Sequence, residues 1–128
     1  MIYQPTKDKI AQLMQEYQQL SKGNSKALQT IAMNELPEMV YHSNAIENST
    51  LTLKDTEEIL IYQQIKKDYN LREVYEAKNL ANITEKLLKN PDQKLTIELI
   101  LALHKILLSG IKDQQAGRFR SGKERVQV

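Results

Sequence analysis

The sequence contains no cysteine and no tryptophan, and it has only four glycines and three prolines among 128 residues. The lack of cysteine excludes disulfides and thiolate metal sites, and it fits a reducing compartment. Because helix breakers are scarce and runs of β-branched residues are few, the composition favours helix over sheet. We therefore predict an all-α protein.

A long hydrophobic run and an excess of charge of one sign are also missing. The longest apolar stretch, Leu99–Leu103, is far too short to span a membrane, and the N-terminus has no signal-peptide core. The 18 basic and 16 acidic residues give a net charge of +2, which is too small and too evenly spread to indicate nucleic-acid binding. We expect a soluble, cytoplasmic protein with no membrane and no nucleic-acid partner.

The residues that are present suit a globular domain. Hydrophobic residues make up 41% of the chain and charged residues 27%, which is enough apolar material for a core. The length fits one domain, 1–128, and not two.

Apolar residues recur at helical spacing along most of the chain. Pro37 should kink or split the second helix, because proline removes a hydrogen bond and crowds the preceding turn. A capping box formed by Thr52 and Asp55 should begin the third helix. The predicted helices run from the N-cap Thr6 to Gly23, from Ser25 towards Ile46, from Thr52 through Tyr62, from Leu71 to Lys89, and from the N-cap Thr96 to Gly110.

Apolar residues form one side of these helices, and in the second and fourth helices we expect that side to face inward. For the first helix these residues are Ile10, Leu13, Met14, Tyr17 and Leu20; for the second, Leu28, Ile31, Ala32, Met39 and Val40; for the fourth, Val74, Ala77, Leu80, Ala81, Leu87 and Leu88; for the last, Ile97, Ile100, Leu101, His104, Leu107 and Leu108.

The tail, residues 111–128, differs from the rest. It has few large apolar residues, and its end, Arg125–Val128, alternates in the way that is typical of a strand. A strand needs a partner strand. We therefore expect this chain to be the front part of a longer fold.

Motifs for catalysis are absent. The two histidines, His42 and His104, do not occur at metal-ligand spacing, and no Gly-rich phosphate loop or nucleophile elbow is present. We interpret His104 as a core-facing histidine, and acids such as Glu58 and Glu73 as parts of solvated helix faces. The sequence thus predicts neither a catalytic residue nor a metal ligand.

The segment Ser43–Asn48 is the exception. Ser43 and Glu47 are four residues apart and share a helix face, and a helix that ends there would project Glu47 outward from its last turn. A carboxylate is mildly disfavoured at the negative end of a helix dipole, so it suggests an external cationic partner. Asn48 can adopt the left-handed conformation that follows a helix end.

Two ordered segments carry a resemblance to Fic-domain proteins. Ser43–Asn48, read with Leu51-Thr52-Leu53 and the helix after it, resembles the family's inhibitory motif S/T-x-x-x-E-G/N. Leu103–Gly110, followed by Gly117-Arg118-Phe119-Arg120 and by Val126 and Val128, resembles the family's leucine–histidine helix and its lead into a β-hairpin.

The resemblance implies an all-α helical bundle of the Fic type, with the start of a β-hairpin flap at its C-terminal end. Residues 1–50 would hold the inhibitory motif, and residues 51–128 the front of the Fic core, truncated before the catalytic loop. Ser43, Glu47 and Asn48 would be regulatory, with Glu47 as the inhibitory glutamate. The residues of the target-docking flap would be Gly117, Arg118, Phe119, Arg120, Val126 and Val128.

Fic proteins transfer AMP from ATP to a hydroxyl side chain of a target protein, with Mg²⁺, through the signature HxFx(D/E)GN(G/K)RxxR. None of this signature is present here, since His42 is followed by SNAIEN and His104 by KILLSG. The resemblance therefore implies ATP and Mg²⁺ for the longer family member, and no turnover by these 128 residues alone.

Several alternatives stay open. The chain could be a stand-alone, antitoxin-like module that inhibits a separate Fic enzyme, and the same Glu47 would serve AMP addition or AMP removal. Self-association is a further expectation. A DNA-binding helical scaffold is disfavoured, because Glu124 interrupts the basic cluster of Arg118, Arg120, Lys123 and Arg125 and no aromatic residues are interleaved with it.

Overall fold

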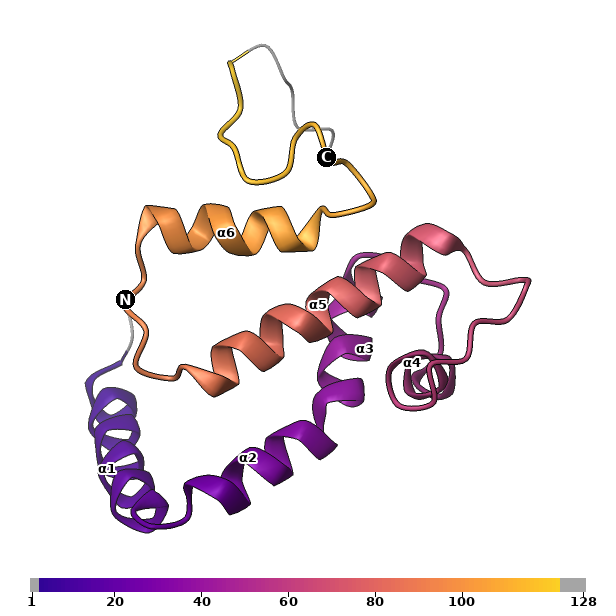
Figure 1. Ribbon diagram of the computed structural model, residues 1–128. Coiled ribbons are helices and arrows are strands. Elements are labelled where there is room, and N and C mark those ends of the chain that lie inside the picture. The colour runs from indigo at the N-terminus through magenta and orange to yellow at the C-terminus, as the bar shows by residue number, and fades with distance from the viewer. Residues whose placement is uncertain (1–2, 123–128) are drawn as a thin grey trace. The chain divides into compact units, whose positions relative to one another are not determined.

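The computed structural model describes residues 3–122, and every regular element in this range is a helix. The all-α prediction is confirmed for these residues. They divide into two compact units, one that ends at Met33 and one that begins at Asn34 (Figure 1). The helices are α1 (Gln4–Ser21), α2 (Ser25–Asn34), α3 (Leu36–Ile46), α4 (Leu53–Leu60), α5 (Leu71–Lys89) and α6 (Ile97–Leu107).

The first unit contains α1 and most of α2. Helix α1 begins at Gln4, with Pro5 in its first turn, so the prediction of Thr6 as N-cap was wrong. Proline fits there because the amide that it lacks would have no partner in a first turn. The predicted apolar stripe is also not covered, since α1 has no buried residue. Its members Ile10, Leu13, Met14, Tyr17 and Leu20 are all between 47% and 74% exposed.

The predicted break at Pro37 is confirmed. Helix α2 ends at Asn34, and α3 begins at Leu36 with Pro37 in its first turn. The proline therefore starts a new helix where a continuous one would lose a hydrogen bond.

Helices α3, α4 and α5 form the core of the second unit, in which each packs on the other two. Figure 1 shows α4 end-on while α5 lies in the plane of the picture, so their axes cross steeply. Val40 from α3 and Ile59 from α4 are fully buried, and Val74 and Ala77 contribute the facing side of α5. The apolar side that the sequence predicts for α5 is thus largely the buried one, except that Leu87 is exposed.

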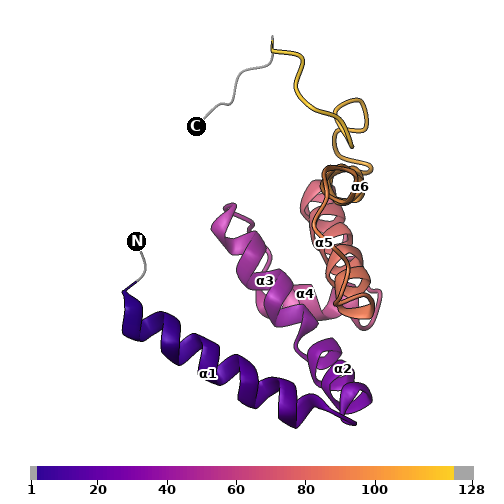
Figure 2. The same cartoon turned by 90° about the vertical axis from the view of Figure 1, so that its left-hand side faces the viewer.

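Helix α6 packs against α5, and the two lie side by side in both views (Figures 1 and 2). The predicted apolar side of α6 is covered only in part. Its members Leu101, His104, Leu107 and Leu108 are half-buried, whereas Ile97 and Ile100 are 58% and 48% exposed. The buried residue of α6 is Leu99, which lies outside the predicted side. Apolar residues lie on nearly every side of this helix, so periodicity alone does not select the face that α5 covers.

A buried asparagine fixes the C-terminal end of α6. The Asn79 side chain, from the middle of α5, donates to the carbonyl oxygens of Leu107 and Ser109 at 3.0 and 2.8 Å. Carbonyls at a helix end have no partner within the helix, so this amide satisfies two groups that would otherwise cost free energy. Asn79 is only 8% exposed. The loop after α6 therefore leaves from a defined point.

Candidate functional site

The segment Ser43–Asn48 ends α3 with a double hydrogen-bonded turn. The Asn48 amide donates to the Ala45 carbonyl, and the Ser49 amide donates to the Asn44 carbonyl, both at 3.1 Å. Asn48 has a φ of 64°, so the predicted left-handed residue after the helix is confirmed. This pattern is the Schellman motif, in which asparagine tolerates the left-handed conformation better than most residues. The turn determines where Glu47 lies.

Glu47 is the C-cap residue of α3, as expected, and its side chain is exposed. Within residues 3–122, the Glu47 carboxylate has neither a hydrogen bond nor an ion pair. Ser43, one turn earlier, is exposed as well. A carboxylate at the negative end of a helix, with no cation bound to it, is the arrangement that an external cationic partner would stabilise.

Glu47 and Asn48 line a cavity of about 490 Å³, and Ser43 does not. The cavity lies between the end of α3, the start of α5 and the end of α6. Its lining residues are Asn44, Glu47, Asn48, Ser49, Asn70, Arg72, Glu73, Glu76 and Leu107. Two of the three predicted regulatory residues thus share one site with residues of α5 that the sequence did not indicate.

Glu73 connects the two sides of this site. Its carboxylate accepts from the Thr50 amide at 2.7 Å and from the Thr50 hydroxyl at 2.7 Å. The side chain is 8% exposed, so the interpretation of Glu73 as part of a solvated face was wrong. A buried carboxylate requires such partners, because an unpaired one would be costly. In the sequence, Glu73 lies three residues after Asn70, the N-cap of α5. This spacing predicts a capping contact within α5 and gives no indication of a contact with Thr50.

The charges that line the cavity are mostly acidic. Arg72 is the one cation among the lining residues, and its Nε donates to Glu76 Oε1 at 2.8 Å. Glu73 is occupied by Thr50, which leaves Glu47 as the lining carboxylate without a partner among residues 3–122. A cationic group would therefore be attracted to this cavity.

The predicted flap residues follow α6. Gly117 donates its amide to Nδ1 of His104 at 3.1 Å, so His104 is a half-buried residue that docks the loop. Gly117 has a φ of 73°, and a Cβ there would lie 2.9 Å from the Lys105 Cβ, so no larger residue fits without movement. Within residues 111–122 no strand is formed, and Phe119 is 66% exposed.

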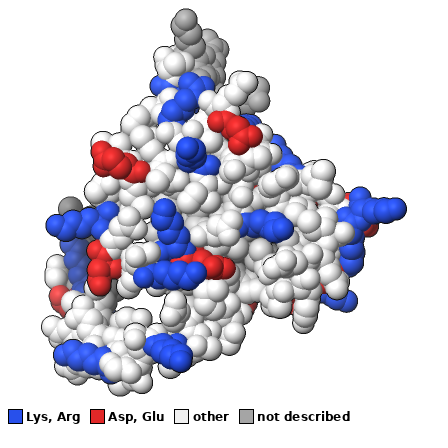
Figure 3. Space-filling model, viewed as in Figure 1, with Lys and Arg blue, Asp and Glu red and all other residues white. Residues whose placement is uncertain are grey.

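The other flap residues are distributed over the rest of the tail. Arg118 Nε donates to the Gln114 carbonyl, which shapes the loop locally. Arg120 lies in irregular backbone. Val126 and Val128, and the predicted strand Arg125–Val128, are outside the described residues. Lysine and arginine side chains are scattered among acidic ones on the face shown in Figure 3.

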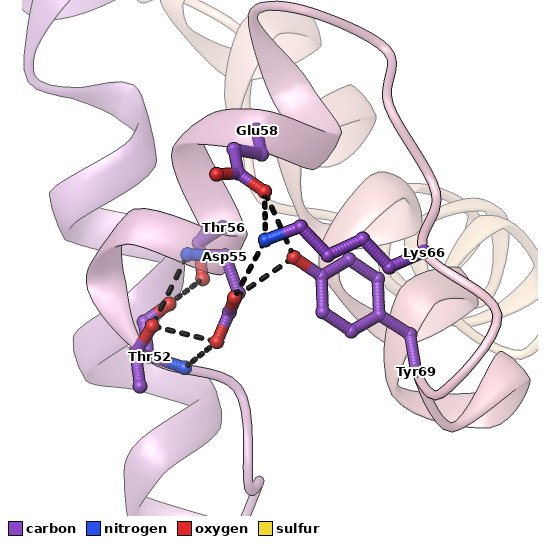
Figure 4. A network of polar contacts seen from close by, with 6 residues as sticks. All are labelled: Thr52, Asp55, Thr56, Glu58, Lys66 and Tyr69. Atoms are coloured by element: carbon purple, nitrogen blue, oxygen red, sulfur yellow. Dashed lines mark hydrogen bonds and ion pairs between the residues drawn. The ribbon is translucent and has the colours of Figure 1, made fainter.

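A second polar cluster holds the loop between α4 and α5 (Figure 4). The capping box is confirmed, since the Thr52 hydroxyl accepts from the Asp55 amide while the Asp55 carboxylate accepts from the Thr52 amide at 3.0 Å. The Tyr69 hydroxyl reaches Asp55 at 2.8 Å and Glu58 at 3.1 Å, and Lys66 pairs with Glu58 at 2.6 Å. Glu58 is therefore also part of a network and not of a solvated face.

These contacts change the acidity of the cluster. The Thr52 hydroxyl, then the Thr52 amide and the Tyr69 hydroxyl, lower the pKa of Asp55 to about 2. The Lys66 ammonium lowers the pKa of Glu58, and Glu58 in turn raises the pKa of Lys66. Burial and the Asp55 carboxylate raise the pKa of Tyr69 to about 12. The cluster is a structural clamp, because its groups bind one another.

The Asp55 contacts predict a dependence of stability on pH. Because the folded pKa of Asp55 lies below the unfolded value, its stabilisation is complete above about pH 4 and is lost as the pH falls towards about 2. The contribution is about 1 kcal/mol, since solvent reaches the side chain and weakens the full effect of the shift. Urea unfolding of Asp55→Asn and of the exposed control Asp68→Asn measures it. Asp68→Asn should lose as much unfolding free energy on acidification as the wild type. In Asp55→Asn this loss should be smaller by about 1 kcal/mol.

Comparison with protein-family models, with curated proteins and with solved structures finds no match for this chain. Among residues 3–122, no helix is both long enough and apolar enough to cross a bilayer. The same residues contain no group of three or more acidic, histidine or cysteine side chains placed to hold a metal ion.

Proposed function

We propose that this chain is the N-terminal portion of a Fic-type protein adenylyltransferase, which transfers AMP from ATP to a hydroxyl side chain of a target protein and is inhibited by its own Glu47. The observation that carries the proposal is the Glu47 carboxylate, which stands at a helix end beside a cavity and has no partner among residues 3–122. ATP and Mg²⁺ belong to the catalytic signature that these 128 residues lack.

The inhibitory step follows from charge. A carboxylate at Glu47 would pair with an arginine of the catalytic signature, and a paired arginine no longer receives the γ-phosphate of ATP. Arginine and carboxylate form a strong, directional fork. The acidic lining of the cavity supports this role, because Glu47 has no cation of its own and the nearby Arg72 is paired with Glu76.

The exposed side of α6 supports a larger Fic-type bundle. A helix that is apolar on nearly every side is normally buried on every side, yet Ile97 and Ile100 are 58% and 48% exposed. A further layer on this side would bury them. In this proposal the layer is the rest of the Fic core, and the loop docked by His104 continues into the flap that aligns the target.

The proposal is tested with the chain extended in frame through the coding sequence that follows Val128. The Glu47→Gly variant is incubated with Mg²⁺ and with ATP that carries its label either on the adenine or on the γ-phosphate. AMP transfer predicts that the protein retains the adenine label and not the γ-phosphate label. Retention of the γ-phosphate label alone would identify a kinase and contradict the proposal.

A second candidate function is a stand-alone module that inhibits a separate Fic enzyme. It is favoured by the missing signature together with an unpaired Glu47, which could meet an arginine of another chain. The coding sequence beyond Val128 decides between the two. An in-frame HxFx(D/E)GN excludes the stand-alone module, whereas a stop codon favours it.

A further inference from the structure

The chain that follows Glu47 is held by one buried side chain. Glu73, in the first turn of α5, accepts both the amide and the hydroxyl of Thr50 at 2.7 Å. Thr50 lies three residues after Glu47. Two bonds from one carboxylate fix the backbone and the side chain of Thr50 together, and hydrogen bonds to a charged acceptor are the stronger kind.

Besides Glu73, the hydrogen bonds of the turn itself and one from the Leu51 amide to the Ser49 hydroxyl at 3.3 Å hold this part of the chain, and apolar packing does not. Val40 is fully buried and Leu51 is 7% exposed, but none of residues 41–50 is buried. Packing therefore holds the first half of α3 and the residue before the N-cap of α4, whereas the segment between them depends on polar contacts. Asn48 sets the direction of the turn, and Glu73 anchors the segment that follows the turn.

We propose that Glu73 is a positioning residue for Glu47: through Thr50 it fixes the end of α3, and with it the place at which the Glu47 carboxylate can meet an arginine. The expected effect on activity rests on the proposed function. The anchoring of Thr50 by Glu73 does not depend on it. Loss of the anchor frees the helix end and weakens inhibition without removing the inhibitory carboxylate.

Hydrogen exchange tests the anchor independently of activity. In Glu73→Ala the amide at position 50 should exchange about tenfold faster, which is the loss of one hydrogen bond, while the amides of Ile59 and Val74 keep their protection. Thr50→Val keeps the amide bond and loses the hydroxyl bond, so its change should be smaller. Thr50→Ser retains both groups and should match the wild type.

A distance measurement tests the position of the helix end. Because the chain has no cysteine, Ile46→Cys and Lys86→Cys introduce two unique sites for spin labels, and Ile46 is already 80% exposed. The distance distribution should broaden about twofold in Thr50→Val and in Glu73→Ala. It should stay narrow in Thr50→Ser. An unchanged distribution in Thr50→Val and Glu73→Ala, with the helical content retained, would overturn the inference.

Activity then separates a positioning role from a general structural one. In the extended chain, Thr50→Val should raise self-labelling, and the double variant with Glu47→Gly should equal Glu47→Gly alone, because both act through one carboxylate. Additive effects would contradict the positioning role. If Glu47→Gly has no effect, the proposed function fails, while the exchange and distance measurements still decide whether Glu73 anchors the helix end.

Discussion

Replacing Glu47 with glycine is expected to raise ATP-dependent self-labelling of the extended chain about a hundredfold. The Glu47 side chain has no partner among residues 3–122, so its removal should leave the fold of this part unchanged. Breaking a buried arginine–carboxylate pair costs about 3 to 5 kcal/mol, and each 1.4 kcal/mol corresponds to tenfold. The measurement is the initial rate of label transfer from adenine-labelled ATP with Mg²⁺.

A matched pair of conservative variants controls for effects on the helix. Glu47→Gln keeps the size of the side chain and removes its charge, so it should also raise labelling. Glu38→Gln makes the same change in the first turn of α3, where Glu38 contacts His42, and it should leave labelling unchanged. Equal labelling by the wild type, Glu47→Gly and Glu47→Gln would refute the inhibitory role of Glu47.

The sign of the effect also distinguishes the two directions of the reaction. If the extended protein removes AMP from its target, Glu47 helps to position the water that attacks, and Glu47→Gly should abolish removal. If the protein adds AMP, the same substitution increases addition. Assays with free target and with AMP-bearing target, run in parallel, separate these outcomes.

Truncating Ile59 to alanine is expected to destabilise the second unit by about 2 to 5 kcal/mol. Ile59 is fully buried where α4 meets α3 and α5, so the substitution removes apolar contacts and leaves a cavity. For a unit of this size the midpoint of thermal unfolding should fall by about 10 °C or more. Circular dichroism during urea and thermal unfolding measures both quantities.

Ile61→Ala provides the control for this prediction. The same side chain is removed two residues further along, but Ile61 is 58% exposed and therefore contributes little burial. Its effect should stay within about 0.5 kcal/mol of the wild type. A comparable loss of stability in both variants would show that α4 does not pack as the structure has it.

Local signals in the sequence predicted the helix ends of the second unit well. The helix from Leu71 to Lys89 has the bounds that were expected, because Asn90 and Pro91 stop it. Thr52 and Asp55 form the predicted capping box. These features depend on residues that are close in the sequence, so local spacing is sufficient to identify them.

The packing partners of the helices could not be predicted in the same way. The apolar stripe on α1 is exposed in the structure. Periodicity identifies a helix face that can be buried, but it does not identify what covers that face. For α6, Leu99, Ile97 and Ile100 offer competing apolar sides, and only the approach of α5 decides that Leu99 is the buried one.

In the candidate site, too, local features could be predicted from the sequence and contacts between distant residues could not. The sequence by itself determined that α3 ends near Glu47 and that Asn48 turns the chain, because a helix end is specified by residues next to one another. Only the tertiary structure decided that Glu73, which looked solvated, is buried and holds Thr50. These residues are 23 positions apart, so no local pattern contains their contact, and burial of the Glu73 carboxylate depends on how α5 meets the chain after α3.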